Sequence, residues 1–167
     1  MDATGRVREV YATSYRRLVG QLTGVTGDPV EAEDVVMEAF ARAVTKSRVF
    51  ADVDNPEAWL RTVAVNIARS RWRRVARLRA LTPRLVDRSS YDDLPADRLA
   101  LLAALRTLPT GQREAIALHH LADLPVHEVA TTLGVPVGTV KAWLSRGRAR
   151  LAVLLDVTVD QEEERHV

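Results

Sequence analysis

The segment that most constrains the fold of this chain runs from Leu124 to Leu155 and reads LPVHEVATTLGVPVGTVKAWLSRGRARLAVLL. Apolar residues recur in it at helical spacing before and after a central glycine, as Val126, Val129, Ala130 and Leu133 and then as Val137, Val140, Leu144 and Leu151. Gly134 follows the first stripe, where glycine accepts the positive φ of a helix C-terminus without steric cost. The separations between Ala130, Gly134 and Val140 predict a helix-turn-helix.

The outward face of the second predicted helix indicates contact with DNA. No acidic residue occurs between Val129 and Leu155, whereas the basic residues there are Lys141, Arg146, Arg148 and Arg150. At about 100° per residue, the positions opposite the core stripe, where base edges would be read, are Gly138, Ala142, Ser145, Arg146 and Ala149. Trp143, Lys141 and Arg150 lie to the sides of this face and suit backbone contacts. Charge alone leaves an alternative open, namely a solvated basic helix that ends an ordinary bundle.

The composition bounds what else the chain can contain. Its 167 residues suffice for one domain of ordinary size or two small ones, and the aromatic content of 5% suits helix bundles with tightly packed cores. The absence of cysteine excludes disulfides, thiolate zinc sites and cysteine nucleophiles. No apolar run approaches the length of a membrane span and no secretory h-region is present, so we expect a soluble, cytoplasmic protein.

The first half of the chain predicts three helices. One covers about residues 3 to 23 and is closed by Gly24 and Gly27. Asp28 then resembles an N-cap, with Pro29 at the first helical position and Glu31 completing a capping box, for a helix that runs to about residue 47. Its expected core stripe consists of Val35, Val36, Ala39, Phe40, Ala43 and Val44. The third helix starts at residues 55 and 56 in the same way, with a buried side of Trp59, Leu60, Val63, Ala64 and Ile67.

An acidic row runs along the second of these helices. Glu31, Asp34 and Glu38 are spaced i, i+3 and i+7, which suits a metal, a basic partner or a solvated face. A di-metal bundle would also need the Glu-x-x-His spacing, which does not occur, so we expect no metal. Met37, an apolar residue beside these charges, hints at a contact surface.

A polar and basic stripe distinguishes the third helix, with Thr62, Asn66, Arg69 and Arg73 at i, i+4, i+7 and i+11. Between Arg61 and Arg84 there is no acidic residue, and the eight arginines are Arg61, Arg69, Arg71, Arg73, Arg74, Arg77, Arg79 and Arg84. This is a second electrostatic footprint for nucleic acid. Phe50 precedes a short polar loop, ADVD, and has two expected fates: stacking on an unpaired base, or core packing, which we favour.

The helical pattern fades between residues 81 and 97, which predicts a flexible linker between a first domain, residues 3–80, and a second, residues 98–156. In the second domain, one helix ends at Pro109 and Thr110 caps the next, so that two scaffold helices and the helix-turn-helix form a four-helix domain. Residues 157–167 are expected to be an acidic disordered tail. His119 and His120 point to different faces and no HExxH pattern occurs, so we predict no enzyme activity.

Three motifs together indicate a family. They are EAEDVVMEAFARA and NPEAWLRTVAVNIARSRWRR in the first half, and LPTGQREAIALHHLADLPVHEVATTLGVPVGTVKAWLSRGRARL in the second. With these motifs in order and in spacing, the chain resembles a group IV (extracytoplasmic function, ECF) sigma factor of bacterial RNA polymerase, of the sigma-70 family, over about residues 6 to 155. The resemblance implies an all-α fold of two small helical domains, sigma region 2 and sigma region 4.

The resemblance also implies a function, partners and site residues. The chain would bind core RNA polymerase and direct initiation at minus-35 and minus-10 promoter elements, helping to melt the DNA, with no cofactor and no small-molecule substrate. Its partners would be the clamp helices of the largest subunit, the flap region of the second-largest subunit, promoter DNA and an anti-sigma factor. The implied residues are Glu31, Asp34, Met37 and Glu38 for docking, Phe50, Thr62, Asn66, Arg69 and Arg73 for minus-10, and Thr139, Lys141, Ala142, Ser145, Arg146 and Arg150 for minus-35.

The chain departs from the family pattern at four of its motif positions. Met37 stands where Gln is usual, so packing would replace a hydrogen bond, and Thr62 replaces an arginine of some relatives, so base choice would differ. Ala142 replaces a serine that reaches DNA in some relatives, and Pro136 replaces a common serine. An autonomous helix-turn-helix regulator is the alternative function, and binding to core polymerase separates the two.

Overall fold

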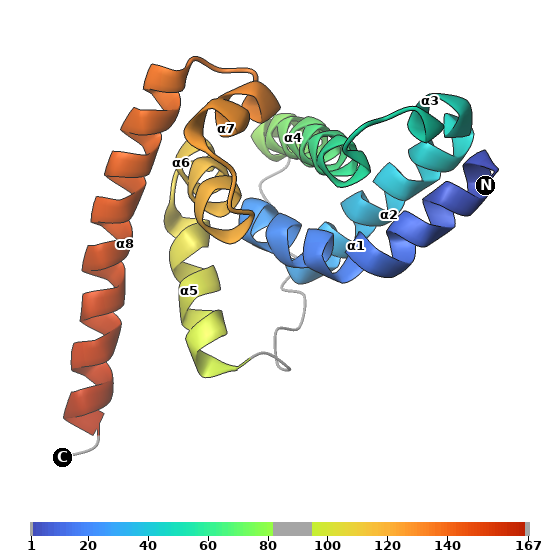
Figure 1. Cartoon of the computed structure of the whole chain (residues 1–167). Helices are drawn as coiled ribbons and strands as arrows, with labels where there is room; N and C mark the ends of the chain where they lie inside the picture. The colour runs from blue at the N-terminus through green and yellow to red at the C-terminus, as the bar shows by residue number, and fades with distance from the viewer. Residues whose placement is uncertain (1, 82–94, 166–167) are drawn as a thin grey trace. The chain divides into compact units, whose positions relative to one another are not determined.

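The computed structural model of the chain describes the backbone of residues 2–81 and 95–165, with the side chains of residues 2–78, 80 and 95–156. Throughout this part of the chain all regular structure is helical, as the sequence predicted (Figure 1). The helices form two units, Met1–Ser89 and Ser90–Val167, each with its own core. None of the described helices combines the length and the apolar character needed to cross a bilayer.

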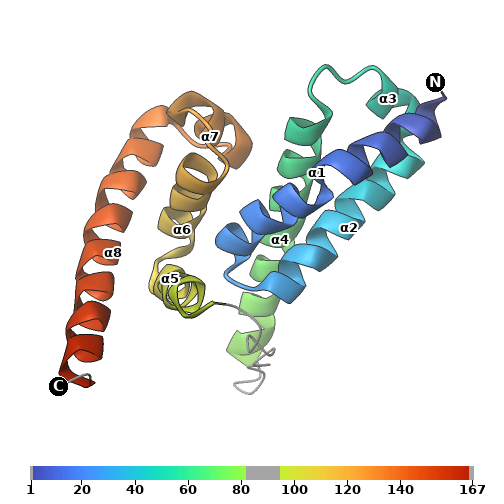
Figure 2. The same ribbon diagram turned by 60° about the horizontal axis from the view of Figure 1, so that its bottom comes forward.

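The first unit contains α1 (Ala3–Thr26), α2 (Pro29–Thr45), α3 (Ser47–Ala51) and α4 (Pro56–Leu81). Helix α1 packs along α2, and both contact α4 (Figure 2). Local chemistry sets the predicted helix starts, because Asp28 Oδ1 accepts from the N–H of Val30 and Asn55 Oδ1 accepts from the N–H of Ala58. Helix α1 continues through Gly24 and ends at Gly27, which has φ 74°.

The core of the first unit joins all four helices. Its fully buried side chains include Leu18 and Leu22 of α1, Val35 and Val36 of α2, Phe50 of α3, and Leu60 and Val65 of α4. The prediction that Val44 belongs to this core is wrong, since its side chain is exposed. Val44 lies about 100° around α2 from the buried Ala43, which carries it beyond the packed face of the helix.

The second unit contains α5 (Ala96–Thr107), α6 (Thr110–Ile116), the π-helical turn η1 (Ala117–Leu121), α7 (Val126–Leu133) and α8 (Val137–Arg165). The helix-turn-helix is formed by α7 and α8, and Gly134 joins them with φ 67°. Thr110 does not cap α6: the helix starts at Thr110 itself, and the preceding Pro109 holds the extended conformation with no side-chain cap. Val137 is exposed as the first residue of α8, so the buried stripe begins at Val140.

The predicted limits of the linker agree with the helix ends, but the predicted C-terminal tail does not. Helix α4 ends at Leu81 and α5 begins at Ala96, close to the expected limits of the 81–97 linker, most of which lies outside the described residues. Helix α8 continues to Arg165, through most of the segment 157–167 that we expected to be a disordered tail. No glycine or proline follows Gly147, so the backbone meets no helix breaker there.

Candidate nucleic-acid and polymerase surfaces

The first half of α8 presents the residues that the sequence predicted for duplex DNA. Lys141, Ser145, Arg146 and Arg150 are exposed, and Thr139 and Ala142 are partly exposed. The opposite side of the helix is buried through Val140 and Leu144. The side chains can therefore reach a groove while the helix stays packed, which is the arrangement that readout by a recognition helix needs.

Two glycines allow α8 to approach α6 closely. A Cβ on Gly111 would lie 2.6 Å from Cζ2 of Trp143, and a Cβ on Gly147 would lie 3.0 Å from Cγ1 of Ile116. Trp143 therefore covers the start of α6, and its ring does not flank the DNA face as the helical projection suggested. These apolar contacts fix the direction in which α8 leaves the domain.

Two adjacent histidines of η1 contact different parts of the second unit, one the chain before α7 and the other α8. The π-helical turn η1 places the rings of His119 and His120 edge to face, with centroids 4.8 Å apart. Nδ1 of His119 donates to the carbonyl of Leu124 at 2.8 Å, and Nε2 of His120 accepts from Nε of Arg148 at 3.1 Å. Burial, Arg148 and His119 together lower the pKa of His120 below its usual value.

The polar stripe predicted on the third helix lies along α4. Asn66 and Arg73 are exposed, and Thr62 and Arg69 are partly exposed. The exposed amide of Asn66 can both donate to and accept from a base edge. The arginines that follow it, from Arg73 to Arg77, are exposed as well, so α4 carries a basic surface beyond Asn66.

Two residues assigned to this nucleic-acid surface belong to the interior instead. Phe50 is 0% exposed, and its ring packs edge to face on Trp59 with the ring centroids 5.3 Å apart. Phe50 is therefore a core residue, and its ring is not available to stack on a base. Arg61, counted in the basic footprint, is only 8% exposed, and its Nε donates to Oε1 of Gln21 at 2.9 Å. Arg61 lies on the side of α4 that faces α1. A count of charges along the sequence cannot distinguish this buried arginine from the exposed ones.

The acidic row lies on α2, but its members differ in their surroundings. Asp34 is exposed, whereas Glu31 and Glu38 are partly buried. Glu38 accepts from Arg42 Nη2 at 3.0 Å and also from Arg71 of α4. Burial raises the pKa of Glu38, but the hydrogen bonds and charges of Arg71 and Arg42 outweigh it and lower the pKa overall. Across the described residues, no cluster of three His, Cys, Asp or Glu side chains could hold a metal ion.

Beside these acids, α2 exposes an apolar stripe of which the sequence indicated only Met37. Val30, Met37 and Val44 are 50%, 47% and 51% exposed and follow one another at seven-residue intervals. A heptad repeat of exposed apolar residues is typical of a helix that packs against another helix along a seam. The seven-residue spacing is visible in the sequence, but the prediction that Val44 is a core residue concealed it.

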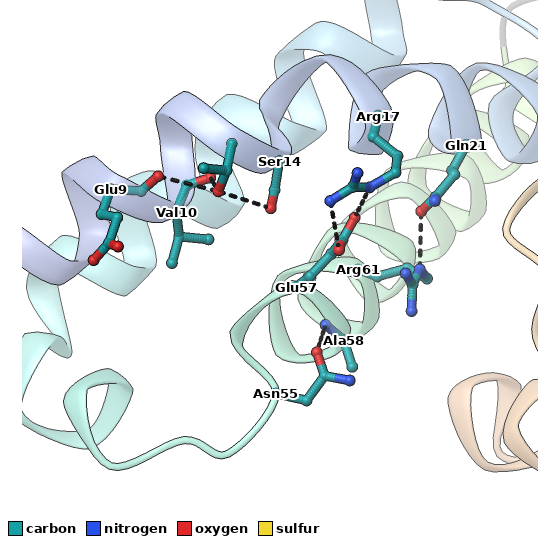
Figure 3. A network of polar contacts seen from close by, with 10 residues as sticks. Glu9, Val10, Ser14, Arg17, Gln21, Asn55, Glu57, Ala58 and Arg61 are labelled. Carbon is teal, nitrogen blue, oxygen red and sulfur yellow. Dashed lines mark hydrogen bonds and ion pairs between the residues drawn. The ribbon is translucent and has the colours of Figure 1, made fainter.

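Polar contacts between α1 and the start of α4 form a further arrangement that the sequence did not reveal. Arg17 makes a two-pronged ion pair with Glu57, with distances of 2.6 and 3.0 Å, and one turn further along each helix Gln21 meets Arg61 (Figure 3). Near the other end of α1, the guanidinium of Arg6 donates to the carbonyls of Ala51 and Val53. Side chains separated by 40 residues or more cannot be paired from spacing alone.

Comparison with protein families finds two matches along the chain. The family described as "Sigma-70 region 2" matches residues 10–78, which span most of the first unit. The family described as "Sigma-70, region 4" matches residues 98–151, which span α5 to the middle of α8. The exposed stripes of α2 and α4 therefore fall in one matched region and the exposed face of α8 in the other.

Curated proteins resemble the chain across both units. It is 34% identical over 146 residues to the RNA polymerase sigma-E factor of Streptomyces coelicolor, covering 83% of this chain and 82% of that protein. It is 37% identical over 131 residues to the ECF RNA polymerase sigma factor SigL of Mycobacterium tuberculosis, covering 72% of each.

Solved structures resemble the chain as well. The sigma factor RpoE of Bartonella quintana, in complex with the anti-sigma factor NepR, matches with a TM-score of 0.74 and 27% identity, over 90% of this chain and 96% of that one. CnrH, in complex with the cytosolic domain of CnrY, matches with a TM-score of 0.62 and 27% identity, over 90% and 88% of the two chains.

Proposed function

This chain belongs to the extracytoplasmic function (ECF) group of sigma-70 family sigma factors, and from that premise we propose how its surfaces divide the work of initiation. As an ECF sigma factor it directs promoter-specific transcription initiation by RNA polymerase, and it is not an enzyme. Sigma factors bind core RNA polymerase and promoter DNA, so the alternative of an autonomous regulator is set aside.

The docking surface for core polymerase is the exposed face of α2. Its apolar stripe (Val30, Met37 and Val44) supplies a seam for packing, and the exposed carboxylate of Asp34 lies beside it. A helical partner with apolar residues along one edge and basic residues beside them fits this face, and the clamp helices of the largest subunit are the proposed partner. Glu38 contributes less charge to the partner because Arg42 and Arg71 already neutralise it.

The minus-10 surface is the loop of residues 52–55 with the exposed stripe of α4. Asn66 is the side chain best suited to read an unstacked base, since an amide offers a donor and an acceptor in one plane. Arg69 and Arg73 follow along the same helix, and we propose that they hold the DNA backbone. Thr62, one turn earlier, is partly exposed and would influence which base is preferred.

The minus-35 surface is the exposed face of α8. Arg146 and Ser145 lie opposite the buried stripe and are proposed to reach base edges in the major groove. Lys141, Thr139 and Arg150 are proposed to contact phosphates beside them, and the methyl group of Ala142 to touch a thymine methyl. The absence of acidic residues from Val137 to Leu155 supports the proposal, because this part of the helix opposes no phosphate with like charge.

Regulation and location complete the proposal. RpoE and CnrH were each solved in complex, one with an anti-sigma factor and the other with a cytosolic domain of a second protein, and we propose that this chain likewise has an anti-sigma partner. Contact with the flap region of the second-largest subunit is proposed for the holoenzyme. The chain would act in the cytoplasm, where core polymerase and promoter DNA are found.

One observation carries the proposal: a single helical unit exposes an acidic and apolar face on α2 and a polar and basic stripe on α4. The test is transcription in vitro with core polymerase on a library of promoters, for the wild-type chain and for Asn66→Ala. We expect wild-type protein to select a minus-35 and minus-10 pair. Asn66→Ala should lower the yield of open complex by about tenfold, because it removes one contact to a base. Binding in the closed complex should change little.

Asn66→Asp sharpens this experiment because it keeps the shape of the side chain but removes its amide donor. If base capture depends on that donor, Asn66→Asp should open promoters as poorly as Asn66→Ala. Equal losses in closed-complex binding and in opening would contradict the assignment of Asn66 to the melted strand.

A further inference from the structure

The loop of residues 52–55 connects α3 to α4 and is bound to α1 where it begins. The guanidinium of Arg6 donates from Nη1 to the carbonyl of Ala51, the last residue of α3, and from Nη2 to the carbonyl of Val53 at 2.5 Å. Both acceptors are backbone groups, and both bonds are partly buried. The planar, five-donor fork of arginine allows one side chain to span two carbonyls, which a lysine cannot do in the same way.

The loop is also bound to α1 just after it ends. Nε and Nη2 of Arg17 pair with the two oxygens of Glu57 at 2.6 and 3.0 Å, in the first turn of α4 (Figure 3). Between these two attachments, Asn55 caps α4 by accepting from the N–H of Ala58 at 3.0 Å. A single helix therefore holds both ends of a short polar loop through two arginines.

The two attachments differ in strength. The side chain of Arg17 is 58% exposed, so water competes for its ion pair with Glu57. Arg6 is only partly exposed. It donates to the carbonyl of Ala51, which as the last residue of α3 has no intrahelical acceptor role, and to the carbonyl of Val53 in the loop. Arg6 is therefore the stronger attachment and Arg17 the weaker one.

We propose that Arg6 and Arg17 are positioning residues that hold the 52–55 loop in the shape in which it receives the unstacked minus-10 base. This inference rests on the proposed function of the loop and of Asn66. A loop that is already ordered loses less conformational freedom when the base enters, and it offers the same contacts at each encounter. Base discrimination depends on that order more than binding of duplex DNA does, because the duplex is held by α8 in the other unit.

The test uses the full chain in holoenzyme with the variants Arg6→Gln, Arg6→Lys and Arg17→Gln. Arg8→Gln is the matched control, because Arg8 lies on the same helix, is exposed and carries the same charge. The measurement is open-complex yield on the preferred promoter and on promoters substituted at each minus-10 position, together with affinity for core polymerase.

We expect Arg6→Gln to lower the ratio of yields between preferred and substituted minus-10 sequences by roughly tenfold, as the loss of hydrogen bonds from a charged donor implies. Arg6→Lys should fall between this variant and wild type, Arg17→Gln should change the ratio by about twofold, and Arg8→Gln should leave it unchanged. Affinity for core polymerase should stay the same in all four variants.

The outcomes separate this proposal from the one it rests on. If Asn66→Ala impairs opening while Arg6→Gln behaves like Arg8→Gln, the role of Arg6 is overturned and base capture stands. If Arg6→Gln lowers the yield equally on every minus-10 sequence, the positioning role is also overturned. If Arg6→Gln does not fold, the ratio measured for Arg6→Lys decides, and a wild-type ratio in that variant overturns the proposal.

Discussion

The two units fix their functional elements in different ways. In the first unit, charged and polar side chains from distant positions hold the loop and the start of α4, through Arg6, Arg17 and the Gln21–Arg61 pair. In the second unit, close apolar contacts at Gly111 and Gly147 set the position of α8. In the first unit these contacts must fix the conformation of an irregular loop, whereas in the second they have only to fix the direction of a regular helix.

This difference follows from what each element supplies by itself. The backbone of α8 satisfies its own hydrogen bonds, so its shape needs no outside support and only its direction must be set by packing. A loop has no such internal ladder, and its carbonyls need partners from elsewhere in the fold. We therefore expect packing changes to act mainly on the second unit, and polar changes mainly on promoter opening by the first.

The largest expected effect comes from Gly111→Val. Its Cβ would meet Trp143 ring atoms at 2.6 to 2.9 Å, so the α6–α8 contact must open. We expect a loss of about 3 kcal/mol in the free energy of unfolding, the upper range for overpacking, measured by urea denaturation. Gly20→Ala is the control, since nothing lies within 4 Å of its Cβ, and it should be neutral or stabilising by up to about 1 kcal/mol. Wild-type stability of Gly111→Val would mean that Trp143 moves aside freely.

The next largest effect is expected on binding of the minus-35 element by the exposed face of α8. Arg146→Ala should weaken binding to the minus-35 element by about 1 to 3 kcal/mol and change its sequence preference, because the side chain is exposed opposite the buried stripe. Arg98→Ala on α5 removes the same charge from the same unit and should have little effect. Holoenzyme binding to a minus-35 library measures both. If the two variants lose affinity alike, net charge and not direct readout accounts for the loss.

A smaller effect is expected at the proposed docking face of α2. Asp34→Arg should weaken association with core polymerase by about 1 to 2 kcal/mol, since reversal replaces a surface attraction with a repulsion, while the fold stays intact. Glu33→Arg makes the same charge change one residue earlier, about 100° around the helix, and should cost less. Binding can be followed by fluorescence anisotropy. A normal holoenzyme formed by Asp34→Arg would show that the docking face was assigned to the wrong side.

The smallest effect depends on pH and on His120. The fold lowers the pKa of this histidine, so its contribution to stability is complete above the unfolded value of about 6.5 and is lost as the pH falls from there through the folded pKa. His120→Gln should flatten the fall in the free energy of unfolding between about pH 7 and 5, by less than about 0.5 kcal/mol because His120 is exposed, as measured by urea denaturation across this pH range. His127→Gln is the control. Parallel pH profiles for wild type and His120→Gln would remove His120 as the cause.

Local signals in the sequence predicted much of the fold. Asp28 and Asn55 start helices because their side chains accept from N–H groups two or three residues ahead, and Gly134 ends one because it adopts a positive φ. Each of these depends on neighbours in the chain. The π-helical turn η1 was not foreseen, since its backbone bonds, such as Ala122 N–H to Ala117 O, have no clear sequence signature.

The sequence predicted the exposure of some candidate site residues correctly and of others incorrectly. The exposed positions of Asn66 and Arg146 followed from helical periodicity, because each lies opposite a core stripe. Phe50 and Arg61 were harder, since a lone aromatic and an arginine on a basic helix have the same local pattern whether they face solvent or another helix. Their burial depends on Trp59 and Gln21, and Gln21 is far from Arg61 in the chain.

The sequence by itself determined most of the helices, the caps at Asp28 and Asn55 and the turn at Gly134, because these depend on residue order over short distances. Its motifs, in order along the chain, also identified the family. The tertiary structure alone decided that Arg6 and Arg17 hold the 52–55 loop and that Glu38 is shared between Arg42 and Arg71. Charged side chains look alike along a chain. Only the packing of one helix on another selects which of them meet, and so which face outward toward a partner.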